Sequence, residues 1–296
     1  MYKFNVLTKN FTSWLLFILI ALIWGSSFIL MKMGLQVLSP YQVAALRMLS
    51  GAIALLPFAF KAFKQVDRKK LPYIILSGFL GSFFPAFLYC IAETRIDSSL
   101  AAILNSFTPM FTIIVGASFF QLKAVWLQIA GVIIGCIGLI LLPFTTQQGI
   151  NFTDMQYSLL VLVATICYAL NVNMVNRHLH NTPSLHIASL AFCFLLPPAL
   201  IILIATGYFN LPLGDTAYWH ASAAAITLGA FGTAIASVLF YMLLKKSGVL
   251  FTSLVTYAIP VVAVLWGILS GESITLPELG CLIIILSGVY LVNKKS

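Results

Sequence analysis

Residues 78–116 read GFLGSFFPAFLYCIAETRIDSSLAAILNSFTPMFTIIVG, and residues 229–267 read GAFGTAIASVLFYMLLKKSGVLFTSLVTYAIPVVAVLWG. Each stretch holds two apolar runs joined by a short charged turn, and a shift of 151 residues, from 78 to 229, superimposes their landmarks. The coincident pairs are Gly78 and Gly229, Gly81 and Gly232, Leu88 and Leu239, Pro109 and Pro260, and Gly116 and Gly267. Self-similarity at a fixed separation predicts an internal repeat.

The composition places both repeats in a membrane. Hydrophobic residues make up 61% of the 296-residue chain and charged residues 8%, with a mean hydropathy of +1.05, whereas soluble domains carry about 25% charged residues. A membrane-spanning helix needs roughly 20 apolar residues. We expect ten such helices, at residues 13–35, 41–60, 72–93, 98–119, 124–143, 156–176, 185–207, 218–244, 249–270 and 277–293. The predicted fold class is therefore an all-α integral membrane protein with a five-helix repeat over 13–143 and another over 156–293.

The basic residues orient these ten helices. If the amino terminus is cytoplasmic, 13 Lys and Arg residues face the cytoplasm and only Arg95 faces the other side. The cytoplasmic set is Lys3, Lys9, Lys61, Lys64, Arg68, Lys69, Lys70, Lys123, Arg177, Lys245, Lys246, Lys294 and Lys295. Cytoplasmic loops carry an excess of Lys and Arg, so both termini are expected inside. The net charge of +9 is then an orientation signal in a lipid bilayer, and no nucleic-acid partner is expected.

The number of helices in each repeat has a mechanistic consequence. Because five is odd, the second repeat enters the membrane from the opposite side, and the two repeats form an inverted pair. Inverted repeats are a recurring plan of secondary transporters, whose substrate site lies near the midplane between the halves. The parity predicts a solute carrier that works by alternating access.

The chain resembles the EamA-type permeases of the drug/metabolite transporter superfamily along its whole length. The resembling residues are Trp24-Gly25-Ser26-Ser27-Phe28, Pro40 with Arg47, the Pro109 and Pro260 helices, and Gly271-Glu272, for which the first repeat has Gln121. The resemblance implies export or exchange of small metabolites, often amino acids, without a built-in ATP site or other cofactor. In a bacterium it implies the plasma membrane. The solute does not carry over, because one architecture serves many solutes.

Small and polar side chains follow one face of the fourth and ninth predicted helices. The pathway candidates on these faces are Asn105, Thr108 and Pro109 in the fourth helix and Thr256, Tyr257 and Pro260 in the ninth. Spacings of three and four residues place each set on one face. These faces either line a solute path, with prolines freeing backbone carbonyls, or let helices pack closely.

Further pathway candidates lie on four other helices. Trp24, Ser26 and Ser27 form a polar step in the first helix, and a shift of 143 residues pairs positions 24–28 with 167–171 of the sixth. Asn171 is expected to line the path or to hydrogen-bond another helix, since a polar residue is costly in lipid. Tyr89 and Tyr241, aligned by a one-residue slip, are either walls of the path or interfacial anchors.

Two cations lie inside predicted helices. Lys32 is close enough to the outer end of the first helix for its ammonium group to reach the lipid headgroups. Arg47 lies only about 5 Å from the middle of the second helix, at 1.5 Å per residue, and must face protein or water. Its partner is expected to be Asp97, backbone carbonyls or an anionic group of the solute.

Other functions lack their residues in this sequence. All seven Asp and Glu residues lie at helix ends or in loops, and no HExxH, GxSxG or P-loop motif is present, so an intramembrane enzyme and an ATP-driven pump are disfavoured. The histidines between 178 and 186 lack the ligands of a metal site, and no metal is expected. A passive channel remains the alternative to a carrier. Gly131, Gly135 and Gly138 share a face that packs within the chain or between the subunits of a homodimer.

Overall fold

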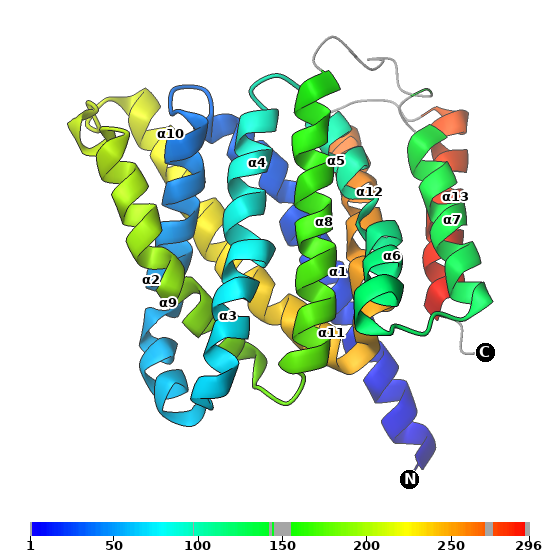
Figure 1. The fold of residues 1–296 in the computed structure, drawn as a ribbon. Helices are drawn as coiled ribbons and strands as arrows, with labels where there is room; N and C mark the ends of the chain where they lie inside the picture. The colour runs from blue at the N-terminus through cyan, green and yellow to red at the C-terminus, as the bar shows by residue number, and fades with distance from the viewer. Residues whose placement is uncertain (1, 97, 142–143, 145–154, 270–274, 294–296) are drawn as a thin grey trace.

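The computed structural model describes residues 2–96, 98–141, 144, 155–269 and 275–293, and the described residues form helices without a strand. Asp97 and Gly271-Glu272 lie outside the described residues. The α-helices run along one another as a bundle (Figure 1). The elements are α1 Tyr2–Gly34, α2 Pro40–Gln65, η1 Arg68–Lys70, α3 Leu71–Gly78, η2 Phe79–Phe83, α4 Phe84–Ala92, α5 Ser98–Asn105, α6 Thr108–Phe120, α7 Trp126–Leu141, α8 Met155–His178, α9 Ser184–Ala205, η4 Tyr208–Asn210, α10 Thr216–Thr227, η5 Leu228–Ile235, α11 Ala236–Ser253, α12 Val255–Leu269 and α13 Leu276–Asn293.

Seven helical segments of the described chain are long and apolar enough to cross a membrane. They are Phe11–Gly34, Pro40–Gln65, Arg68–Ala92, Leu100–Phe120, Gln156–His178, Ser184–Ala205 and Thr216–Ser253, and Trp126–Leu141 and Leu279–Val292 are shorter apolar helices. The prediction of an all-α, multi-pass integral membrane protein is therefore correct. The start of α1 and the end of α13 lie at the same end of the bundle (Figure 1).

Several helices that the sequence predicts as continuous are interrupted. The predicted helix over 98–119 consists of α5 and α6, which are separated at Ser106 and Phe107, just before Pro109. Proline has no backbone N–H to donate to the preceding turn, so the helix restarts there.

The residue range 236–253 assigned to α11 contains Gly248 at φ 82° and ψ 174°, a backbone conformation that glycine adopts readily. At this glycine the chain turns between the eighth and ninth predicted helices.

Two π-helical segments occupy equivalent places in the two predicted repeats. The shift of 151 residues carries η2, at 79–83, onto 230–234, which lies within η5 at 228–235. The π-helix is rare and is frequently found at functional sites. It also removes carbonyls from the regular hydrogen-bond pattern, and such a carbonyl can accept a bond from another helix.

Glycines bring α7 and α13 into close contact. A methyl group added at Gly131 would lie 2.8 Å from the Gly288 carbonyl oxygen, and one added at Gly138 would lie 3.0 Å from the Cys281 carbonyl oxygen. The ring of Tyr257 fills the space beside Gly135. The glycine face of the fifth predicted helix thus packs within the chain, which is the first of the two alternatives drawn from the sequence.

A second close contact joins α2 to η5. Ser39 and Gln42 form a capping box that begins α2, and the helix then passes Gly229 so closely that an added methyl group would collide with Ser50 Oγ and the Arg47 carbonyl. The backbone approach at Gly229 therefore sets the position of Arg47 relative to the second half of the chain.

Gly229→Ala is expected to lower the free energy of unfolding by about 1–3 kcal/mol, because a crowded site must shift to admit the methyl group. Gly280→Ala is the matched control, since nothing lies within 4 Å of an added Cβ there and alanine favours a helix over glycine by about 1 kcal/mol. Thermal unfolding of the detergent-purified variants measures both. Equal stability of the two alanine variants would mean that α2 does not depend on the Gly229 contact.

Candidate functional site

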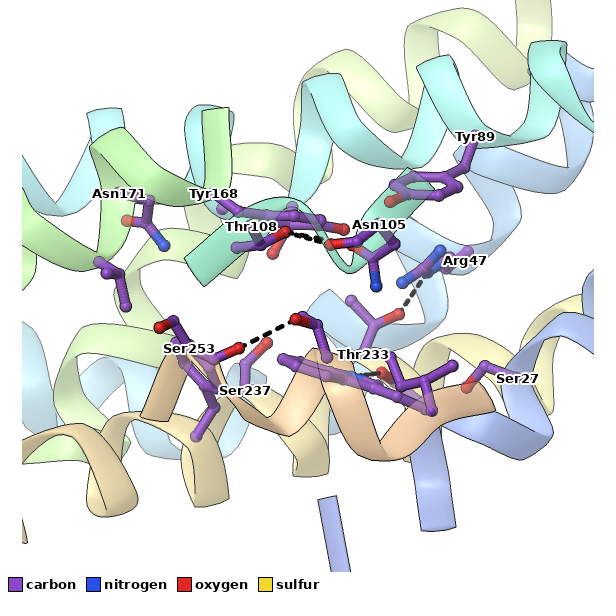
Figure 2. A pocket seen from close by; sticks show the side chains of 18 of the residues that line it. Ser27, Arg47, Tyr89, Asn105, Thr108, Tyr168, Asn171, Thr233, Ser237 and Ser253 are labelled. Carbon is purple, nitrogen blue, oxygen red and sulfur yellow. Dashed lines mark hydrogen bonds between the residues drawn. The ribbon is translucent and has the colours of Figure 1, made fainter. Parts of the chain in front are cut away.

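A cavity of about 90 Å³ lies inside the bundle. Its wall comes from α1, α2, η2, α4, α5, α6, α8, η5, α11 and α12, so helices from both predicted repeats surround it (Figure 2). The lining residues are Trp24, Ser27, Phe28, Met31, Arg47, Gly81, Ser82, Tyr89, Asn105, Thr108, Tyr168, Asn171, Val172, Gly232, Thr233, Ser237, Phe240, Tyr241, Ser253, Thr256 and Ile259. A water molecule needs about 10–15 Å³ of such volume, so the cavity is large enough for a small solute.

The lining contains residues related by the two sequence shifts. Five pairs separated by 151 residues contribute both members, namely Gly81 and Gly232, Ser82 and Thr233, Tyr89 and Phe240, Asn105 and Thr256, and Thr108 and Ile259. Phe28 and Asn171, separated by 143 residues, also both line it. The cavity therefore lies where equivalent parts of the two halves meet.

Arg47 reaches the cavity from α2 and is held by the second half of the chain. Its Nε donates a hydrogen bond of 2.5 Å to Thr233 Oγ1 on η5 (Figure 2). The Thr233 hydroxyl in turn donates to the Leu228 carbonyl. This carbonyl lies five residues earlier, the spacing of a π-helix. Thr233 is thus the described hydrogen-bond partner of Arg47, and the sequence did not predict it.

Trp24 joins α1 to the same π-helical segment. Its indole Nε1 donates to the Gly232 carbonyl at 3.0 Å, and its ring lies 5.3 Å from that of Phe240. A few residues along, Ser27 donates to the Ile23 carbonyl of its own helix at 2.7 Å. The indole of Trp24, in the polar step of the first helix, therefore forms a hydrogen bond to the second half of the chain.

The two tyrosines predicted as walls of a path or as interfacial anchors both lie inside the bundle, at the cavity. Tyr89 and Tyr241 are both 4% exposed and line the cavity. Tyr241 bonds Ser77 Oγ at 2.8 Å, while the Tyr89 ring lies 6.3 Å from the rings of Phe28 and Tyr168. Together these rings form an aromatic wall that can contact an apolar solute.

Hydroxyl groups satisfy the carbonyls at the helix break beside the cavity. Thr108 donates to the Asn105 carbonyl at 2.6 Å, and Ser106 bridges from the Ala102 carbonyl at 2.9 Å to the Thr256 carbonyl of α12 at 3.1 Å. Thr256 donates to the Ser253 carbonyl at 3.0 Å. The break between α5 and α6 is thereby tied to the corresponding helix of the second half.

Two buried polar atoms of the lining have no hydrogen-bond partner within the described part of the chain. They are the Tyr89 hydroxyl and Asn171 Oδ1, and each residue is 4% exposed. Buried polar groups in proteins are nearly always paired. Both groups are therefore available to a bound solute.

Four of the thirteen predicted pathway residues lie outside the lining. Tyr257 packs beside Gly135 and donates to the Val132 carbonyl at 2.8 Å, because it is one residue, or about 100°, around the helix from Thr256. Ser26 is half-buried and next to the lining residue Ser27. Pro109 and Pro260 are buried; Pro109 lies in the first turn of α6, directly after the break, and Pro260 lies inside α12.

The lining also contains residues that the sequence prediction omitted. Gly81, Gly232, Tyr168 and Ser253 carried a usable signal, since they are repeat landmarks or members of the polar faces. The others are Phe28, Met31, Ser82, Val172, Thr233, Ser237, Phe240 and Ile259. An apolar residue in an apolar helix gives no sign of facing a cavity, and the hydroxyl groups of Ser82, Thr233 and Ser237 can instead bond within their own helix. Only the helix packing identifies these eight residues as part of the lining.

Glu93 follows the last residue of the span Arg68–Ala92. Its Oε2 accepts a 3.2 Å hydrogen bond from Ser98, and its Oε1 is buried without a partner among the described residues. Burial raises the pKa of this carboxyl to about 8, against the smaller lowering effects of Ser98, Arg47 and Lys32. The sequence placed Glu93 at a helix end but gave no sign that its carboxyl is buried.

The EamA-like transporter family matches residues 12–144 and residues 155–294. An uncharacterized transporter of Archaeoglobus fulgidus is 28% identical over 95% of this chain and 99% of its own length. A probable amino-acid metabolite efflux pump of Salmonella typhimurium is 27% identical over 64% of this chain and 62% of the pump. The uncharacterized inner membrane transporter YedA of Escherichia coli is 27% identical over 92% of this chain and 87% of YedA.

A solved crystal structure has the same fold. It superimposes with a TM-score of 0.72 over 94% of this chain and 95% of the other, at 16% identity. At that identity the likeness concerns the fold alone.

Glu93→Gln is expected to remove a pH dependence of stability. Because the folded pKa of about 8 lies above the ordinary 4.5, the stability contributed by the Glu93 proton is present below pH 4.5 and lost as the pH rises through 8. The melting temperature of the wild type should therefore fall relative to that of the variant by a few degrees between about pH 5 and about pH 9. Asp215→Asn, at an exposed acid, is the control. Parallel curves for wild type and Glu93→Gln would contradict the buried, raised-pKa carboxyl.

Proposed function

Because the chain belongs to the EamA-like transporter family, we propose that it is a secondary transporter which carries a small metabolite through the central cavity by alternating access. The observation that supports this proposal most directly is the cavity itself, which is lined by residues at equivalent positions of the two halves. A site on the pseudo-symmetry axis of an inverted repeat can be exposed to either side by related movements of the halves. The family and the relatives named as transporters and efflux pumps make this chain a transporter and not an enzyme.

The membrane arrangement we propose is ten spanning helices with both termini in the cytoplasm. The two segments matched by the family, 12–144 and 155–294, agree in extent with the two five-helix repeats expected from the sequence. The distribution of Lys and Arg supports the orientation. The π-helical segments at equivalent places support the relation between the halves.

Export or exchange is the direction we propose, with a metabolite related to amino acids as the cargo class. The support is the naming of two relatives, in Salmonella typhimurium and Escherichia coli, as probable amino-acid metabolite efflux pumps. The cavity adds hydrogen-bonding groups and an aromatic wall, which suit a small solute with one polar and one apolar part.

The interrupted helices provide the movement that alternating access requires. The backbone break at Ser106 and the segments η2 and η5 adjoin or contribute residues that line the cavity. Such places absorb backbone rotations while the helices on either side move as rigid bodies. Hydrogen bonds between the halves, from Trp24 and Arg47 to η5, are the contacts that change in this movement.

A passive channel differs from a carrier in a measurable way. Liposomes that contain the purified protein are loaded with unlabelled amino acids and organic acids, and the entry of the same solutes in labelled form is followed. A carrier shows trans-stimulation by the unlabelled solute inside, whereas a channel does not. If the folded protein moved no member of the panel, the transport proposal would lose its support.

Ser237→Phe is expected to abolish the flux of the transported solute, because the added ring occupies the small cavity that Ser237 lines. Ser287→Phe on the exposed face of α13 makes the same substitution away from the cavity and should retain wild-type flux. The measurement is initial uptake into liposomes at equal protein content. Full activity of folded Ser237→Phe would place the solute path elsewhere.

A further inference from the structure

Arg47 is the one charged side chain among the described residues that line the cavity. A guanidinium group stays protonated in proteins, and a cation at this depth of a membrane protein requires a partner. Within the described residues, Arg47 donates only through Nε, to Thr233, and no carboxylate forms an ion pair with it. Its Nη1 and Nη2 are therefore left for another acceptor.

The position of Arg47 suits a bidentate acceptor. A guanidinium held through Nε presents its two terminal nitrogens as a planar fork that matches a carboxylate. Figure 2 shows Arg47 and Tyr89 turned into the same end of the cavity, while Asn171 lies toward the other end. The Tyr89 hydroxyl, buried and without a partner among the described residues, adds a neutral donor beside the fork.

The rest of the lining indicates what the anionic group is attached to. Trp24, Phe28, Tyr168 and Phe240 contribute aromatic surface around the cavity. With about 90 Å³ available and about 10–15 Å³ needed per water, the solute has on the order of ten non-hydrogen atoms. No acidic side chain belongs to the described lining, and the buried Glu93 carboxyl, on which the Arg47 charge acts, lies outside it. A cationic solute therefore meets a repelling charge and no carboxylate in the cavity wall.

We propose that the Arg47 end of the cavity binds the carboxylate of a small organic anion, whose apolar body lies against the aromatic wall. This assignment rests on the proposed transport function and adds its solute chemistry. The carboxylate accepts from Arg47 Nη1 and Nη2 and from the Tyr89 hydroxyl. An amino group on the solute is not required for binding.

The test is a binding measurement on the detergent-purified full chain, which is independent of flux. The probes are benzoate, 3-phenylpropionate and 4-methylpentanoate, each compared with its own primary amide by isothermal titration. The amide has nearly the same shape but no charge. We expect at least one carboxylate to bind about tenfold more tightly than its amide, the effect of about one hydrogen bond to a charged group.

Variants of the chain show which residues produce the preference for a carboxylate over its amide. Arg47→Gln should reduce the ratio between carboxylate and amide affinity to less than about twofold, and Arg47→Lys should restore part of it, because a lysine keeps the charge without the fork. Lys32→Gln removes an exposed cation in the last turn of α1 and should leave the ratio unchanged. If Arg47→Gln does not fold, Tyr89→Phe and Thr233→Val carry the test, each with a reduced ratio.

The outcomes separate the two proposals. Equal affinities for every carboxylate and its amide in the folded wild type would overturn the assignment, as would a preference that survives Arg47→Gln. Asp97→Asn tests the ion pair between Asp97 and Arg47 that the sequence analysis considered. If Asp97→Asn lost the carboxylate preference and Arg47→Gln kept it, the assignment of the carboxylate to Arg47 would also be overturned. If the carboxylate preference depends on Arg47 but the protein moves no solute, the anion site is supported and the proposed transport function is not.

Discussion

A helix in a lipid bilayer must satisfy its own backbone hydrogen bonds, because no water is present in the hydrocarbon to do so. Irregular backbone is tolerated at that depth only where it is buried in protein or lines a water-filled cavity. In this protein the π-helical segments η2 and η5 and the break between α5 and α6 contribute residues to a single cavity. The location of the site follows from this constraint.

The freed backbone groups are used to join the two halves of the chain. The Gly232 carbonyl accepts from Trp24 of α1, and the Thr256 carbonyl accepts from Ser106 after α5. Arg47 of α2 is bonded to Thr233 of η5. These bonds link residues 150 to 208 positions apart, so the cavity exists only when the halves are assembled, and a movement of one half against the other alters its walls.

Close helix contacts have two different uses here. At α7 and α13, away from the cavity, the glycines bring two helices together without contributing to the site. At Gly229 the same device brings α2 close enough to η5 for Arg47 to reach Thr233. A small-residue face alone does not distinguish packing from a pathway, and the neighbours of each glycine decide between them.

Composition and sequence patterns were enough to identify the membrane class, the family and most of the polar members of the site. Trp24, Ser27, Arg47, Tyr89, Asn105, Thr108, Asn171, Tyr241 and Thr256 were all predicted and all line the cavity, because a polar group inside an apolar run is costly and therefore visible. The packing of the helices was needed to show that Tyr257 faces α7, that Thr233 holds Arg47, and that Phe28 and Phe240 form part of the wall. Hydrophobicity is nearly the same for a side chain facing lipid, another helix or an apolar solute. Which of these it faces depends on the rotation and packing of whole helices, which no local pattern of residues specifies.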